Sequence, residues 1–180
     1  LWSIPIRLRQ GAGDAAATTS VLLEGDEMRV PATGGPVVVN AGGHGFFRVS
    51  YSDELRAELT ADVVAQMSTL ERYNLVDDAW NAVVAGALHA TEYVELVERF
   101  GDEHEHSVWQ SIAIGLRAVG RLIGDEEPAR SGFRSRVVAL ARPALESLGD
   151  PASGESELTA RLRGLLLGLV AVLGGDADAR

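Results

Sequence analysis

The pattern of hydrophobic positions changes from strand-like to helical near residue 51. Residues 1–9 alternate apolar and polar side chains, which is typical of a strand with one buried face. Residues 37–51 contain two apolar runs, at 37–39 and 46–51, separated by a glycine-rich segment. Because glycine adopts the backbone angles of a sharp reversal, this stretch predicts strand, turn and strand. Strand pieces at 21–24 and 28–30 complete a predicted β part of four or five strands, and Pro5 favours an edge position or a bulge.

From residue 52 onward the pattern is helical. Ser52 is a good N-cap, and Leu55, Leu59, Val63 and Met67 recur at the spacing of one helix face. Further helices are expected at 74–88, 91–100, 108–123, 129–148 and 155–173, with a break at Pro143. Six or seven short-looped helices predict a bundle or an irregular α-solenoid. Because the strands are too few to close a sandwich, we expect a missing N-terminal partner. The broad apolar face of 155–173 favours an array that continues beyond residue 180.

Composition and charge exclude several classes of function. The chain has 180 residues, 46% of them hydrophobic, and a formal net charge of −10, which argues against a nucleic-acid or anionic membrane partner. The absence of cysteine excludes disulfides, thiolate metal sites and cysteine nucleophiles, and is compatible with the cytoplasmic location that we expect. The longest apolar run, at 165–173, is far shorter than the roughly 20 residues that span a bilayer.

One cluster, at residues 101–106, contains enough ligand-type side chains to suggest a metal site. Its side chains are those of Asp102, Glu103, His104, Glu105 and His106. The two histidines are two positions apart, so a helix would point them in different directions. The acids precede an apolar helix, where both capping and the helix dipole favour them. We therefore interpret the cluster as a solvated helix cap, and no metal ligand is assigned to it.

The remaining candidates for chemistry also have structural interpretations. Asp77 and Asp78 are expected as first-turn acids of a helix rather than as an acid–base pair. His89 and Glu92 match part of an inverted zinc motif, but the motif is incomplete because Tyr93 occupies the position that requires histidine. The glycines of residues 42–45 predict a hairpin or bulge rather than a phosphate loop. Two further expectations are that Arg48, in an apolar stretch, finds a partner carboxylate or carbonyl, and that all three tryptophans pack in the core (Trp2, Trp80 and Trp109).

The order of several short segments resembles the C-terminal half of the M1 family of zinc aminopeptidases, the group that includes puromycin-sensitive and endoplasmic-reticulum aminopeptidases. The segments that carry the resemblance are W-x-I-P-I at 2–6, V-L-L at 21–23, V-N-A-G-G-H-G-F-F-R-V-S-Y at 39–51, E-R-Y-N-L-V-D-D-A-W at 71–80 and E-H-S-V-W at 105–109. A weaker similarity continues through Phe133, Pro143 and Leu148-Gly149 to L-R-G-L-L-L at 162–167.

This resemblance implies a partial Ig-like antiparallel β-sandwich at 1–51 as a linker domain. It also implies that residues 52–180 begin an all-α domain, an α-α superhelix of irregular, HEAT-like helices. The family's zinc ligands and catalytic residues belong to a catalytic domain that has no counterpart here. The implied site residues are therefore none, whether catalytic, cofactor-binding or metal-binding. No cofactor is expected in this chain, and zinc is expected in the catalytic domain of the parent enzyme.

The leading hypothesis is a non-catalytic C-terminal fragment of an M1 aminopeptidase. In the parent enzyme it would cap the active-site chamber and restrict peptide access, with the rest of that chain and peptide substrates as its partners. One alternative is a free-standing helical-repeat module that binds a protein or peptide. Another is an autonomous metal-dependent enzyme that uses His104 and His106.

Overall fold

The computed structural model describes residues 2–179 and divides the chain into two compact units, Leu1–Ala79 and Trp80–Arg180. The first unit contains a three-stranded antiparallel sheet and two short helices. The second contains the longer helices. The boundary lies within α3 (Thr69–Val84), a helix that begins in the first unit. The predicted order, an antiparallel β part followed by helices, is confirmed.

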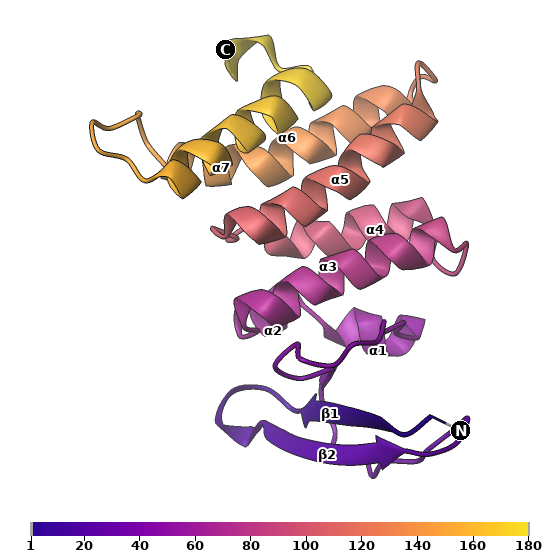
Figure 1. Ribbon diagram of the computed structural model, residues 1–180. Helices are drawn as coiled ribbons and strands as arrows, with labels where there is room; N and C mark the ends of the chain where they lie inside the picture. The colour runs from indigo at the N-terminus through magenta and orange to yellow at the C-terminus, as the bar shows by residue number, and fades with distance from the viewer. Residues whose placement is uncertain (1, 180) are drawn as a thin grey trace. The chain divides into compact units, whose positions relative to one another are not determined.

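The sheet has the strand order β2-β1-β3. Strand β1 (Ile4–Gln10) pairs along its length with β2 (Ala17–Leu23), and the two lie side by side in Figure 1. On its other edge β1 pairs with β3 (Val37–Val39), but only from Leu8 onward. Pro5 therefore lies in the part of β1 that has a neighbouring strand on one side only, where a missing N–H donor is tolerated.

Two predicted strands are not formed, at 28–30 and at 46–51. The second error has a physical reason, because the amides of Val49, in this segment, and of Val39, in β3, bond to side chains instead of to each other's strands. The Val49 amide N–H donates to an Asp78 carboxylate oxygen at 3.0 Å. The Tyr51 hydroxyl in turn accepts a hydrogen bond from the Val39 amide at 2.9 Å. Side chains of this unit thus satisfy the groups that a β-ladder would otherwise need.

The helix predicted from Leu55 to Met67 is divided in two. Helix α1 (Asp53–Glu58) is capped by the Ser52 hydroxyl, as expected, and α2 (Ala61–Ala65) starts after a break at Leu59. Leu59 leaves helical geometry, with φ −79° and ψ 65°, and its side chain is completely buried. Burial of this side chain outweighs helix continuity, because breaking a turn loses few hydrogen bonds whereas exposing leucine loses about 2 kcal/mol.

The second unit is built from successive helices that pack against their neighbours, as Figure 1 shows for α4 to α7. These are α4 (Ala90–Val97), which continues as the 3₁₀ turn η2 (Glu98–Phe100), α5 (His106–Ile123), α6 (Ala129–Ser147) and α7 (Glu157–Leu167), which continues as the π-helical segment η3 (Gly168–Leu173). The short 3₁₀ turns η1 (Gly13–Ala15) and η4 (Ala177–Ala179) complete the structure. The core side chains include Val97, Trp109, Ile112, Leu116 and Leu166, all almost fully buried.

Helix α6 runs through Pro143, where the sequence predicts a break. Proline leaves the carbonyl one turn earlier, at Ala139, without an intrahelical donor. Both residues are exposed, so water can satisfy that carbonyl at low cost. Among the described residues, no helix is long and apolar enough to cross a membrane.

Candidate functional site

The most elaborate polar arrangement of the first unit is centred on Glu71, in the first turn of α3. Ser68 precedes this helix as its cap, and the two residues bond reciprocally. The Ser68 hydroxyl accepts from the Glu71 amide at 3.3 Å, and the Glu71 carboxylate accepts from the Ser68 amide at 2.8 Å. This is the capping box that the spacing Ser-x-x-Glu favours. The local sequence therefore places the Glu71 carboxylate at the N-terminus of α3.

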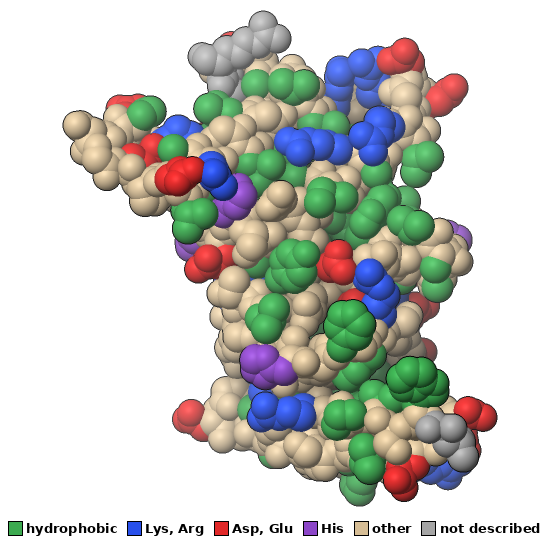
Figure 2. Space-filling view, viewed as in Figure 1, with side chains coloured by type: hydrophobic (Ala, Val, Ile, Leu, Met, Phe, Trp, Pro, Cys, Tyr) green, Lys and Arg blue, Asp and Glu red, His purple; other side chains and the backbone are tan. Residues whose placement is uncertain are grey.

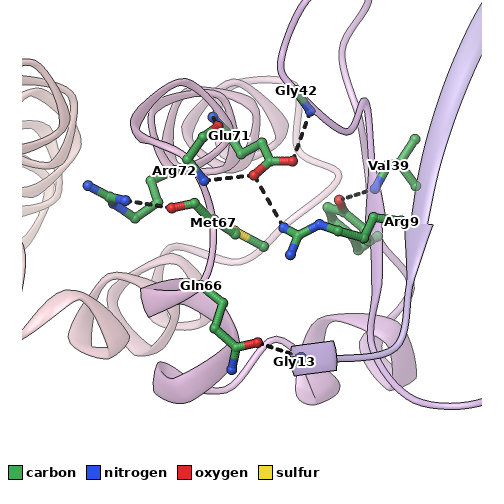
Figure 3. Close-up of polar contacts among 10 residues, drawn as sticks. Arg9, Gly13, Val39, Gly42, Gln66, Met67, Glu71 and Arg72 are labelled. Atoms are coloured by element: carbon green, nitrogen blue, oxygen red, sulfur yellow. Dashed lines mark hydrogen bonds and ion pairs between the residues drawn. The ribbon is translucent and has the colours of Figure 1, made fainter. Parts of the chain in front are cut away.

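Tertiary structure then uses the same carboxylate to join α3 to the β part (Figure 3). One oxygen of Glu71 accepts a hydrogen bond from the Gly42 amide at 2.8 Å, and the other lies 3.2 Å from the Arg9 guanidinium. The pair is largely removed from water, since the Glu71 and Arg9 side chains are 8% and 18% exposed. A buried carboxylate needs several donors, and Glu71 obtains them from three separate segments.

The loop that presents Gly42 has a conformation that only particular residues allow. Asn40 has a φ of 61°, and its side-chain amide bonds to both the N–H and the carbonyl of Gly45, at 2.7 and 3.1 Å. Gly43 also has a positive φ, and a Cβ there would lie 2.5 Å from the Leu70 side chain. The close approach of loop and α3 therefore requires glycine. The chain turns here as predicted, but the predicted hairpin is not formed, because residues 46–51 are not a strand.

A second buried acid, Asp78, holds the segment that follows this loop. Besides accepting from the Val49 amide, it lies 3.7 Å from the Arg48 guanidinium, which also contacts Asp77 at 2.9 Å. The expectation that Arg48 finds a carboxylate partner is confirmed. Asp77 and Asp78 lie well inside α3, so their predicted place in a helix first turn is wrong. The misplacement arose because α3 begins at Thr69, five residues before the helix start predicted at residue 74.

Burial dominates the electrostatics of these groups. It raises the pKa of Asp78 above its ordinary value of 3.8, against the opposing effects of the Val49 hydrogen bond and of Arg48. Burial likewise raises the pKa of Tyr51 to about 12, although the hydrogen bond from Val39 acts in the opposite direction. Tyr51 is therefore a neutral hydroxyl at any physiological pH, and it acts as a structural acceptor rather than as a base.

We call the set formed by Arg9, Gly42, Tyr51, Glu71 and Asp78 the polar joint. Three of its members, Tyr51, Glu71 and Asp78, line a cavity of about 10 Å³, which is room for one water molecule at most. The two acids of the polar joint face backbone amides and guanidinium groups. Chemically, this arrangement can hold the segments of the first unit together.

The pKa of Asp78 predicts how this unit responds to pH. Because folding raises that pKa, the folded chain holds the proton more tightly than the unfolded chain, so the contribution of Asp78 to stability falls as pH rises from about 3.8. Replacing it with Asn removes this contribution and keeps an oxygen that can accept from Val49. In urea unfolding between pH 3.5 and 6, the stability of wild type minus that of Asp78→Asn should fall with increasing pH. A difference that stays flat or rises would contradict the assignment.

The cluster at 101–106 is organised around Glu103, which is 4% exposed. Its carboxylate accepts hydrogen bonds from the amides of His104 and Glu105, at 2.9 and 2.8 Å, just before α5 begins. Its backbone carbonyl accepts from the Trp109 indole at 2.8 Å. The acids thus precede α5 as expected, but Glu105 at the N-cap makes no side-chain capping hydrogen bond, and the central acid is buried rather than solvated. Among the described residues, no group of three or more potential ligands is arranged to hold a metal ion.

The other sequence candidates also have structural partners. The His89 amide donates to the Glu92 carboxylate at 3.0 Å at the start of α4. Trp80 packs edge-on against Tyr93, with ring centroids 5.4 Å apart, and Trp109 is fully buried. Trp2 is 88% exposed, so its predicted core position is wrong. It precedes β1 by two residues, outside the paired part of the sheet, where no neighbouring strand covers it.

Sequence reasoning missed Glu71 and Glu103 as central residues. The capping spacing from Ser68 to Glu71 was the available signal, but it indicates only a helix start. That Glu71 also reaches Gly42 and Arg9 depends on contacts between residues 29 and 62 positions apart.

Comparison with known proteins gives a consistent family. Residues 36–180 match the family model described as the ERAP1-like C-terminal domain. Aminopeptidase M1-B of Oryza sativa subsp. japonica is 28% identical over 193 aligned positions, covering 98% of this chain and 22% of the relative. Aminopeptidase M1-C of the same organism is 34% identical, covering 73% of the chain and 15% of the relative. Puromycin-sensitive aminopeptidase of Caenorhabditis elegans is 28% identical, covering 64% and 13%. The chain thus spans less than a quarter of the length of each relative.

Proposed function

The chain belongs to the family of ERAP1-like C-terminal domains, and we propose on this basis that it is the non-catalytic part of an M1-type zinc aminopeptidase. In that enzyme it caps the active-site chamber and restricts which peptides enter. Residues 1–51 serve as the linker domain, and residues 52–180 begin the helical domain. The catalytic domain of the parent holds the zinc ion and removes N-terminal residues, in the cytoplasm.

The observation that carries this proposal is that the buried acids bind backbone amides and arginines of the chain itself. Glu71, Asp78 and Glu103 each accept hydrogen bonds from backbone amides, and Glu71 and Asp78 also contact arginine. The cavity lined by Tyr51, Glu71 and Asp78 holds no more than a water molecule. Peptide hydrolysis by a metallopeptidase needs an open cleft in which an activated water meets the scissile bond. A scaffold needs the reverse, namely acids committed to holding segments in place.

The first test is a peptidase assay of the 180-residue chain on aminoacyl fluorogenic substrates, with zinc measured on the same sample. We expect no turnover and no stoichiometric zinc, because no group of three or more potential ligands among residues 2–179 is arranged to hold a metal ion. The matched variants are His104→Ala and His106→Ala, which should behave like the parent chain. Zinc-dependent turnover that either variant abolishes would contradict the scaffold assignment and favour an autonomous metalloenzyme.

The chamber role requires a separate measurement on an enzyme that contains both this domain and a catalytic domain. Loosening the polar joint by Glu71→Gln, which removes the negative charge opposite the largely buried Arg9, should change the rate of cleavage of long peptides more than that of a small aminoacyl dye, whose access is less restricted. Equal effects on both substrates would argue against control of access. A chain that instead binds a protein partner in isolation, with no effect on peptide length preference, would favour the free-standing interaction module.

A further inference from the structure

A cleft of about 450 Å³ opens in the second unit between α5, α6 and η3. This volume falls in the range of small-molecule sites. Part of its wall is apolar and comes from Phe133 of α6 and from Val172 and Leu173 of η3. Gly120 of α5 lets these side chains approach, because a Cβ there would lie 2.9 Å from Leu173 and 3.1 Å from Phe133.

The rest of the wall carries four arginines. Arg117 and Arg121 lie four positions apart on α5, and Arg130 and Arg134 lie four positions apart on α6. Residues four apart share a helix face, and like charges in this arrangement repel each other and destabilise the helix. Two such unfavourable pairs converge on one cleft, and an anion bound there would relieve both.

Ion pairing distinguishes this cleft from the rest of the second unit. Elsewhere in this unit Arg136, Arg142, Arg161 and Arg163 each contact a carboxylate. In the cleft only Arg130 does so, through Asp125. The side chains of the other three, Arg117, Arg121 and Arg134, make no hydrogen bond or ion pair with any residue between 2 and 179.

These unpaired cations occur in a chain whose formal net charge is −10. Figure 2 shows a group of basic side chains at the C-terminal end of α5 and the adjoining part of α6, with acidic side chains beside it. Glu126 and Glu127 follow Asp125 in the α5–α6 turn, but neither lines the cleft. A local positive field is therefore maintained on an acidic protein, which attracts anions to this position.

We propose that this cleft binds a small, soluble phosphate monoester that carries an apolar group. Arginine presents a planar fork of donors that matches phosphate oxygens, and three unpaired guanidiniums suit a dianion with three terminal oxygens. A monocarboxylate would pair with one guanidinium group and leave the positive charges of the other two without a counter-ion. The apolar wall at Phe133, Val172 and Leu173 receives the organic group. This site is independent of the scaffold role, because it involves none of the residues of the polar joint.

Isothermal titration calorimetry of the 180-residue chain tests the proposal with phenyl phosphate, inorganic phosphate and phenol as probes. Phenyl phosphate should bind more tightly than either of the others, because only it can contact both the arginines and the apolar wall. Arg117→Gln and Arg134→Gln should each weaken phenyl phosphate binding about tenfold or more, since each removes a charge-assisted contact. Higher salt should weaken it as well.

The matched control is Arg161→Gln, which removes an exposed arginine that already pairs with Glu157 outside the cleft. It should leave the affinity for phenyl phosphate unchanged, and circular dichroism should show all three variants folded. Equal binding of phenol and phenyl phosphate, or unchanged affinity in both cleft variants, would overturn the proposal. So would binding to vesicles that contain phosphatidic acid without binding to phenyl phosphate, which would indicate a lipid surface instead.

Discussion

Replacing Glu71 with Ala is expected to lower the free energy of unfolding by about 3–5 kcal/mol, as measured by urea denaturation. The change removes the acceptor for the Gly42 and Ser68 amides and leaves Arg9 as a largely buried, uncompensated charge. Uncompensated buried charge is costly because the interior cannot replace the lost solvation. The effect should be the largest of any single acid in the first unit, since no other acid there joins three segments.

The matched control for this prediction is Glu157→Ala. Glu157 also pairs with an arginine, Arg161, but both side chains are exposed, at 78% and 61%. Solvent screening reduces such pairs to less than about 1 kcal/mol. A loss below 1 kcal/mol in Glu71→Ala, similar to that in Glu157→Ala, would show that the polar joint contributes little to stability.

The substitution Gly115→Ala is expected to destabilise the second unit by about 1–3 kcal/mol, although alanine is the better helix former. Gly115 lies on α5 opposite Tyr93, and a Cβ at this position would be 2.3 Å from the tyrosine oxygen and 2.4 Å from the ring carbon that carries it. Tyr93 is fully buried, and its hydroxyl donates to the Ile112 carbonyl. The ring is therefore closely packed, and the free-energy cost of the steric overlap exceeds the gain in helix propensity.

Gly132→Ala provides the control of opposite sign. Gly132 is also helical, on α6, but a Cβ there meets no atom within 4 Å. Only the difference in helix propensity remains, so the free energy of unfolding of this variant should rise by roughly 0.5–1 kcal/mol. Thermal and urea unfolding of the two variants should thus shift in opposite directions. A stabilised Gly115→Ala would mean that α4 and α5 are less tightly packed than the structure indicates.

The helices of the second unit could be predicted from sequence because their signals are local. Apolar spacing identified α5, and Gly124, with a φ of 59°, ends it where the sequence predicts. The same reasoning located β1 and β3 through alternation and the valine run. It failed at residues 46–51, where β propensity is high but the Val49 amide bonds to Asp78. Propensity describes a segment by itself, whereas a strand also needs a neighbouring strand.

The sequence by itself determined the order of the elements, the cap at Ser52 and the need for glycine in the turn after β3. These features depend on interactions within a few residues, which the chain encodes locally. Only the tertiary structure decided that Glu71 serves as both helix cap and polar joint, that Leu59 interrupts a helix, and that four arginines converge on one cleft. Such features arise from side chains distant along the chain, and their free energies appear only when burial brings them together.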